Sequence, residues 1–153
     1  MNAFHFSELI FLAIVAYTHA SELSMDGGNY VVKWTYMPLT QEIEFDVRAK
    51  ATGWVGLGIT KFNSGMKKMD IIVGGNYQGA MTYLKDYYST ATTKPIKDSQ
   101  QDYTLISATQ TNGKTVVVFK RKLKTGDEKD IEIVKLITSN LMEFLCQVLA
   151  KKD

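Results

Sequence analysis

Alternation between charged and apolar side chains is the clearest pattern in this chain, and it is most regular over residues 42–49. Every second position there is apolar, namely Ile43, Phe45, Val47 and Ala49. A period of two places these side chains on one face of a β-strand and the charged ones on the other. Residues 42–49 are therefore predicted to form a strand with one face against a core.

Further short runs are rich in β-branched and aromatic residues, as strands are. They cover residues 30–34, 54–59, 70–74, 80–84, 103–107 and 115–119. Short strands at regular spacing with turn residues between them are typical of an antiparallel sandwich. The sequence therefore predicts an all-β, immunoglobulin-like β-sandwich of one domain.

Turn residues set the expected connections. Asn112-Gly113 predicts a hairpin, because both residues tolerate the positive φ of a type I′ turn. Residues 74–76, Gly-Gly-Asn, are predicted to form a turn of the same kind, and residues 125–127 another. Polar residues 60–69 and 89–102 are expected to be surface loops.

The C-terminal stretch 136–149 fits two structures. Its apolar residues follow helical spacing, and Asn140 suits a helix cap, which favours a short C-terminal helix. A final edge strand over residues 141–149 is the alternative.

The N-terminal residues have the features of a secretory signal. Residues 9–16 are apolar, and the small residues Thr18 and Ala20 have the spacing that signal peptidase prefers. We predict a signal peptide over residues 1–20, a secreted mature protein and no membrane span after its removal. An uncleaved anchor or a buried strand is the alternative.

Charge and composition limit the kinds of partner that the sequence predicts. The formal net charge of +2 is too small to indicate binding to nucleic acid. The basic run Lys120, Arg121, Lys122 and Lys124 is predicted to lie on a solvated face. The single cysteine, Cys146, has no partner for an internal disulfide, so it is buried, free or paired with another chain.

The two histidines, His5 and His19, both lie in the predicted signal. Copper centres that hydroxylate substrates need several imidazole ligands, and zinc sites need His or Cys. A serine nucleophile needs a base such as His. The mature domain is therefore predicted to be non-catalytic.

Several motifs occur in an order that resembles the DOMON domain over about residues 30–133. They are GWVGLG at 53–58, Met66 followed by DIIVGG at 70–75, YLKDYY at 83–88, DSQQDY at 98–103 and FKRKLKTGD at 119–127. The group that they resemble most is that of the dopamine hydroxylase-like copper type II monooxygenases. In that group a DOMON domain precedes two copper-binding catalytic domains.

The resemblance implies a DOMON domain over residues 28–135 and a divergent tail over 136–153. It implies a module that binds a small ligand or an extracellular protein. The alternative function is that of a haem- or copper-associated redox component, as a fragment of a monooxygenase-like enzyme.

The resemblance also implies two candidate sites. Met66 stands where haem-binding DOMON domains place a ligand, but the histidine partner is missing, which favours a packing role. Asp70 and Asp102, with the carbonyls of Ile71 and Tyr87, match a proposed metal site. Oxygen ligands of this kind suit Ca²⁺ or Na⁺. The alternative is that both aspartates cap turns.

Overall fold

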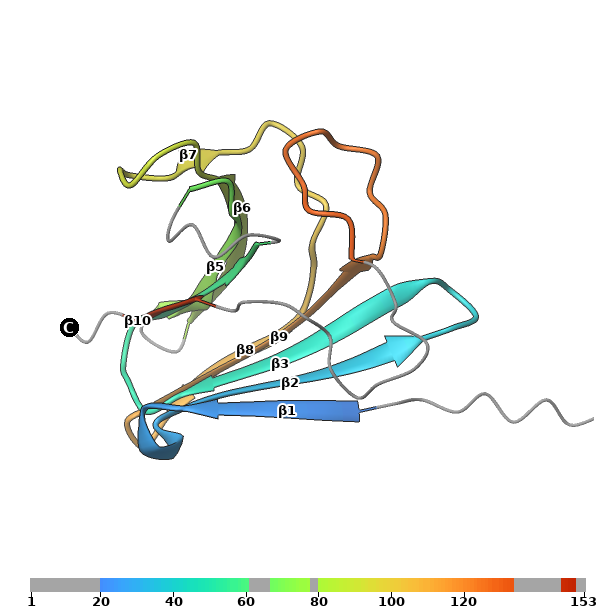
Figure 1. Ribbon diagram of the computed structural model, residues 1–153. Helices are drawn as coiled ribbons and strands as arrows, with labels where there is room; N and C mark the ends of the chain where they lie inside the picture. The colour runs from blue at the N-terminus through green and yellow to red at the C-terminus, as the bar shows by residue number, and fades with distance from the viewer. Residues whose placement is uncertain (1–19, 61–66, 78–79, 134–146, 151–153) are drawn as a thin grey trace, which may run out of the picture.

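The computed structural model describes residues 20–60, 67–77, 80–133 and 147–150, and these form two five-stranded antiparallel sheets (Figure 1). The first sheet has the order β1-β2-β3-β9-β8 and the second β10-β4-β5-β6-β7. The strands are β1 Ala20–Met25, β2 Tyr30–Met37, β3 Glu42–Ala49, β4 Trp54–Ile59, β5 Asp70–Tyr77, β6 Met81–Tyr88, β7 Ile96–Lys97, β8 Thr104–Thr111, β9 Lys114–Lys122 and β10 Gln147–Ala150.

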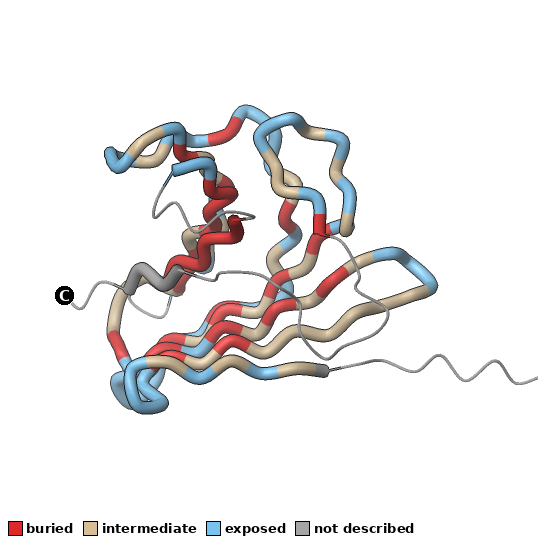
Figure 2. The backbone as a smooth tube through the Cα atoms, viewed as in Figure 1, coloured by how far each residue is buried: buried red, intermediate tan, exposed pale blue. Residues whose placement is uncertain are grey.

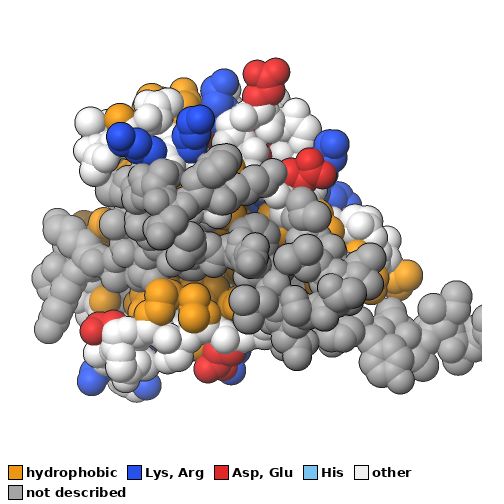
Figure 3. All heavy atoms as spheres, viewed as in Figure 1, with side chains coloured by type: hydrophobic (Ala, Val, Ile, Leu, Met, Phe, Trp, Pro, Cys, Tyr) orange, Lys and Arg blue, Asp and Glu red, His pale blue; other side chains and the backbone are white. Residues whose placement is uncertain are grey.

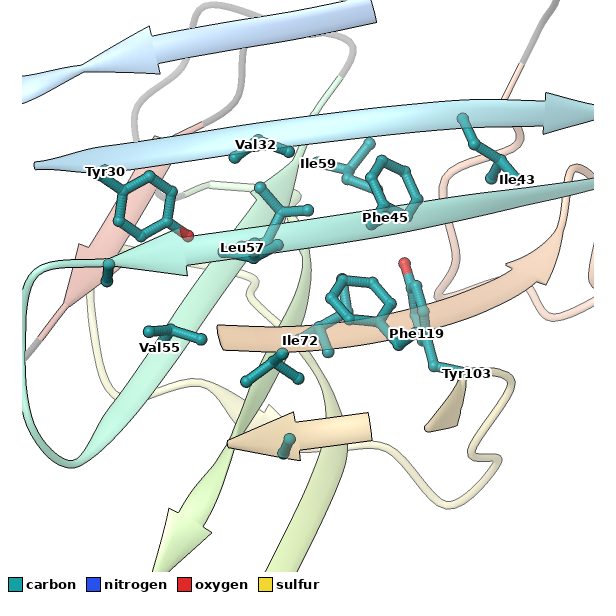
Figure 4. Packing of buried hydrophobic residues seen from close by; sticks show 14 of the residues in the cluster. Tyr30, Val32, Ile43, Phe45, Val55, Leu57, Ile59, Ile72, Tyr103 and Phe119 are labelled. Carbon is teal, nitrogen blue, oxygen red and sulfur yellow. The ribbon is translucent and has the colours of Figure 1, made fainter. Parts of the chain in front are cut away.

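The core lies between the two sheets and follows from the alternation in the sequence. In β3 the buried residues are those at every second position, from Ile43 to Ala49, as predicted. Phe45 stacks on Phe119 with ring centroids 5.4 Å apart, and Tyr103 meets Phe119 edge to face at 5.7 Å (Figure 4). Buried positions run along the facing sides of both sheets (Figure 2). The all-β sandwich is therefore confirmed.

The turn predicted at residues 74–76 is wrong, because β5 continues through them to Tyr77. Neighbouring atoms leave no room for a side chain at either glycine. A Cβ on Gly75 would lie 2.8 Å from the carbonyl oxygen of Gly53, and one on Gly74 would lie 2.8 Å from Leu84 Cδ1. These glycines allow close packing within a strand.

The C-terminal prediction is corrected in part. Residues Gln147–Ala150 form β10, which pairs with β4, so a helix is wrong at these residues and an edge strand is present. The rest of that stretch, with Cys146, lies outside the described residues, as do residues 1–19 and Met66. The described residues contain no α-helix and no helix long and apolar enough to cross a membrane.

Two strands were not predicted, β1 and the two-residue β7. The edge strand β8 carries a β-bulge between Leu105 and Ser107, where its register to β9 shifts. The Asn112-Gly113 turn joins β8 to β9 with φ of 51° and 72°, as predicted. Figure 3 shows that side chains of both charge signs are interspersed on the face it presents.

We expect Gly75→Ala to lower the free energy of unfolding by about 1–3 kcal/mol, because the added methyl group overlaps a backbone atom that cannot turn aside. Urea unfolding measures this change. Thr82→Ala, at an exposed position of the neighbouring strand β6, is the control and should have a much smaller effect. Equal stability of the two variants would show that the backbone at Gly75 has room to move.

Candidate functional site

Buried charged groups gather at one end of the sandwich, where β5, β6 and β9 meet a loop that follows β9. We call this loop, residues 123–133, the strap; it is the orange loop above β9 in Figure 1. The acidic cluster consists of Asp70, Asp86, Asp98, Asp102 and Asp130. Five carboxyls at one end of a core are costly to bury unless each charge is compensated.

Arg121 provides the cation within this end of the core. Its Nη1 lies 2.5 Å from Asp70 Oδ2, and both side chains have an exposed fraction of 0%. Tyr103 donates its hydroxyl hydrogen to Asp70 Oδ1 at 2.9 Å, and Arg121 donates to the same hydroxyl oxygen at 3.0 Å. The pair joins the sheets, because Asp70 begins β5 in the second and Arg121 is in β9 of the first.

Arg121 was predicted to lie on a solvated face, and that prediction is wrong. It shares its strand face with Phe119, which is 2% exposed. Lys122 lies on the other face, and 56% of its side chain is exposed. The run of basic residues therefore divides between the two faces of β9 by the ordinary alternation of a strand.

The strap supplies further contacts to the same pair. The backbone N–H of Ile131 donates to Asp70 Oδ2 at 3.2 Å, and Arg121 Nη2 donates to the carbonyl oxygen of Ile131. Asp130 Oδ2 lies 3.5 Å from Arg121 Nη1 as an ion pair. The strap is thereby placed directly over the acidic cluster.

Asp70, Asp86 and Asp130 each bring a carboxylate oxygen to within 4.8 Å of the others. Asp86 is only 2% exposed, and its Oδ1 has no hydrogen-bond partner among the described residues. The buried Oδ2 atoms of Asp98, Asp102 and Asp130 also lack a hydrogen bond within that part of the chain. Buried polar atoms without partners call for an explanation such as a bound ion.

The raised pKa values of the clustered carboxyls also favour a bound ion. Burial, followed by the charges of Asp70 and Asp130, raises the pKa of Asp86 to about 8. Burial raises the pKa of Asp70 to about 6, and the Arg121 guanidinium limits the rise. Burial likewise raises the pKa of Asp102. Without added positive charge, Asp86 would hold a proton at neutral pH.

The residues predicted for the metal site lie at this end of the fold. Asp70 is in the cluster, and Asp102 joins it through a backbone N–H that donates to Asp86 Oδ2 at 3.4 Å. Ile71 and Tyr87 are paired across β5 and β6, next to Asp70 and Asp86 in the chain. The described residues do not include Met66, so its predicted role is not tested.

Sequence reasoning missed Asp86, Asp98, Asp130 and Arg121. Asp86 and Asp98 were inside the quoted motifs, so the spacing of acidic residues within those motifs was a usable signal. Asp98 does accept a turn-type hydrogen bond, from the backbone N–H of Gln100 at 3.1 Å, which leaves its second oxygen free for another ligand. Asp130 lies in a polar loop and carried no signal.

The chain is similar to several known proteins. A profile of the DOMON domain family matches residues 26–140. DBH-like monooxygenase protein 1 of Homo sapiens is 34% identical over 117 residues, which cover 76% of this chain and 18% of that protein. MOXD1 homolog 2 of Drosophila melanogaster is 31% identical over 111 residues, which cover 71% of this chain and 14% of that protein. The chain therefore spans less than one fifth of the length of these relatives.

Among solved structures, one similarity is to the cytochrome domain of Myriococcum thermophilum cellobiose dehydrogenase. Its TM-score is 0.49 at 14% sequence identity, over 69% of this chain and 55% of that one.

We expect Arg121→Met to lower the free energy of unfolding by about 3–5 kcal/mol, because it leaves the Asp70 carboxylate buried without its cation. Lys122→Met is the matched control on the next position of β9, and we expect a change within about 0.5 kcal/mol. Chemical denaturation at neutral pH measures both. A small effect of Arg121→Met would mean that the acidic cluster is neutralised by other means.

We also expect stability in the presence of a chelator to fall as the pH rises from about 4 to about 8. The unfolded Asp86 carboxyl ionises near its ordinary pKa of 3.8, whereas the folded one holds its proton until about pH 8. The folded protein therefore binds more protons within this window, and raising the pH favours the unfolded chain. Thermal unfolding of the wild type and of Asp86→Asn tests this, and the variant should show a smaller slope. A slope of opposite sign would refute the pKa assignment.

Proposed function

The chain belongs to the DOMON domain family, and we propose that it acts as a secreted, non-catalytic binding module whose acidic cluster holds a hard cation. The observation that carries this proposal is the set of buried carboxylate oxygens, on Asp86, Asp98, Asp102 and Asp130, that have no hydrogen-bond partner among the residues that the structure describes. The apolar stretch 9–16 supports export through a cleavable signal.

The charge count favours Ca²⁺ over Na⁺. The Arg121 guanidinium compensates Asp70, and it also lies beside Asp130. Within the described part of the chain, no ion pair involves Asp86, Asp98 or Asp102. A divalent ion cancels more of this charge, and Ca²⁺ accepts six to eight oxygens in flexible geometry. Water and backbone carbonyls, such as those of Ile71 and Tyr87, would complete its shell.

The donor set fits neither copper nor haem. Residues 20–153 contain no histidine, and every side-chain donor in the cluster other than Arg121 and Tyr103 is a carboxylate. Copper and haem iron in redox proteins take imidazole, thiolate or thioether ligands. We therefore assign the module a binding role, with a small ligand or an extracellular protein as its partner.

The cation would act as part of the fold. It replaces the proton on Asp86 and holds together side chains from β5, β6 and the strap. Calcium sites in extracellular modules have dissociation constants of about 10⁻⁴–10⁻³ M, which suits an ion that is always available outside the cell. In such a site the metal keeps a binding surface in one conformation.

We expect Ca²⁺ at about 100 times its dissociation constant to stabilise the protein by about 2.7 kcal/mol relative to chelator. Asp86→Asn and Asp102→Asn should each weaken binding measured by calorimetry and reduce this gain, because each removes a ligand. Asp26→Asn, in the exposed turn after β1, is the control and should bind as the wild type does.

Metal analysis of the purified protein identifies the ion. Parallel titrations with Na⁺, Mg²⁺ and Ca²⁺ separate a specific site from general screening. If no cation binds above the level of the Asp86→Asn variant, the proposal is wrong, and the acidic cluster is neutralised by protons alone.

A further inference from the structure

The strap is fixed to the sandwich in an unusual way. In the described chain, residues 124–132 take part in no backbone-to-backbone hydrogen bond, and such bonds occur only at the two ends, Leu123 and Ile133. Leu123 donates to the carbonyl oxygen of Gln41 at 2.9 Å, and Ile133 donates to that of Leu123 at 2.9 Å. The interior of the strap is therefore held by side chains.

Most of those side chains belong to the acidic end of the core. Ile131 exchanges hydrogen bonds with Asp70 and Arg121, and Asp130 is an ion-pair partner of Arg121. The remaining contacts lie nearer the surface. Gln100 donates to Asp127 at 2.5 Å, and Lys129 lies over the Tyr88 ring at 5.7 Å.

We propose that the strap is a cation-operated latch: an ion shared by Asp130, Asp70 and Asp86 holds it closed, and loss of the ion releases residues 124–132. This inference rests on the proposed function, since it needs a cation in the acidic cluster. The latch adds to that function a change in the conformation of the strap when the cation binds. The observation behind it is that the three carboxylates come from different segments. Asp70 lies in β5 and Asp86 in β6, whereas Asp130 lies in the strap.

Electrostatic repulsion supplies the opening force. With no ion present, a carboxylate oxygen of Asp130 lies within 4.8 Å of oxygens of Asp70 and Asp86, and Asp130 shares the Arg121 guanidinium with Asp70. The carboxylates of Asp130 and Asp70 carry like charges at this distance, and they repel each other in a poorly solvated site. Moving the strap outward lets Asp130 reach water without breaking a backbone ladder, and what it gives up is the set of contacts that Ile131 and Asp130 make with Asp70, Arg121 and the core.

The buried residue Ile133 anchors the end of the strap, so the release is local. Opening would expose the charged end of the core, with Arg121 and Tyr103, to solvent. The ion would thereby decide which surface the module presents at this end. A partner that recognises the closed strap would bind only when the cation is present.

Hydrogen–deuterium exchange on the whole chain tests the latch. With saturating Ca²⁺, the amide of Ile131 should be protected by its bond to Asp70. In EGTA we expect exchange in residues 124–132 to become at least about tenfold faster, as for a locally opening segment, while β3 and β9 remain protected. Trypsin gives a second readout, because Lys124 and Lys129 lie on the strap and should be cut faster without Ca²⁺.

Asp130→Asn and Asp127→Asn form the matched pair, since both change one strap carboxyl to its amide. In Asp130→Asn the exchange rate of the strap should no longer depend on Ca²⁺. Asp127→Asn, whose side chain contacts Gln100 and the backbone of Lys129, should keep the wild-type response.

Calorimetry of Ca²⁺ binding distinguishes the proposed cation site from the proposed latch. If Ca²⁺ binds and strap exchange does not change, the latch is wrong and the cation site stands. If Ca²⁺ does not bind, both are wrong. If Asp127→Asn abolishes the response as Asp130→Asn does, the ion acts on the strap through overall charge, and the latch is again wrong.

Discussion

Arg121 and Asp70 join the two sheets at one end of the core, and the arrangement of the other charged groups follows from this contact. Asp70 begins β5 and Arg121 lies near the end of β9, so the pair fixes the position of one sheet relative to the other. A buried ion pair adds little net stability compared with apolar residues of the same size. Its value here is geometric, because the same two side chains also hold the backbone of Ile131.

The rest of the charged end can be understood as an imbalance around that pair. The sandwich has an apolar core that needs no further partner, whereas the acidic cluster has more carboxyls than cations. Excess negative charge of this kind can be neutralised by protons or by a metal ion. One carboxylate oxygen cannot bind both at the same time. The charged end is therefore the part of the described structure whose charge balance depends most on the pH and on the ions around it.

The sequence was a good guide wherever a residue's role depended on its strand neighbours. The alternation around Phe45 predicted the buried face of β3 and the sandwich, and the motif order predicted the family. It was a poor guide where the role depended on residues distant in the chain. Arg121 looked like part of a solvated basic run because its partner, Asp70, is 51 positions away. Gly75 looked like a turn residue because the obstructing carbonyl of Gly53, in the bend before β4, is distant in the chain. Asp130 joins the cluster only because the strap folds back.

The β-bulge between Leu105 and Ser107 has a consequence for how copies of the chain behave towards each other. Strand β8 is the edge of its sheet, and its outer backbone groups could pair with a strand from another molecule. A bulge twists the edge and breaks the regular ladder that such pairing requires. The exposed side chain of Ile106 stands within this irregular segment. The bulge thereby opposes edge-to-edge pairing of two copies at a strand, β8, that carries no charged residue.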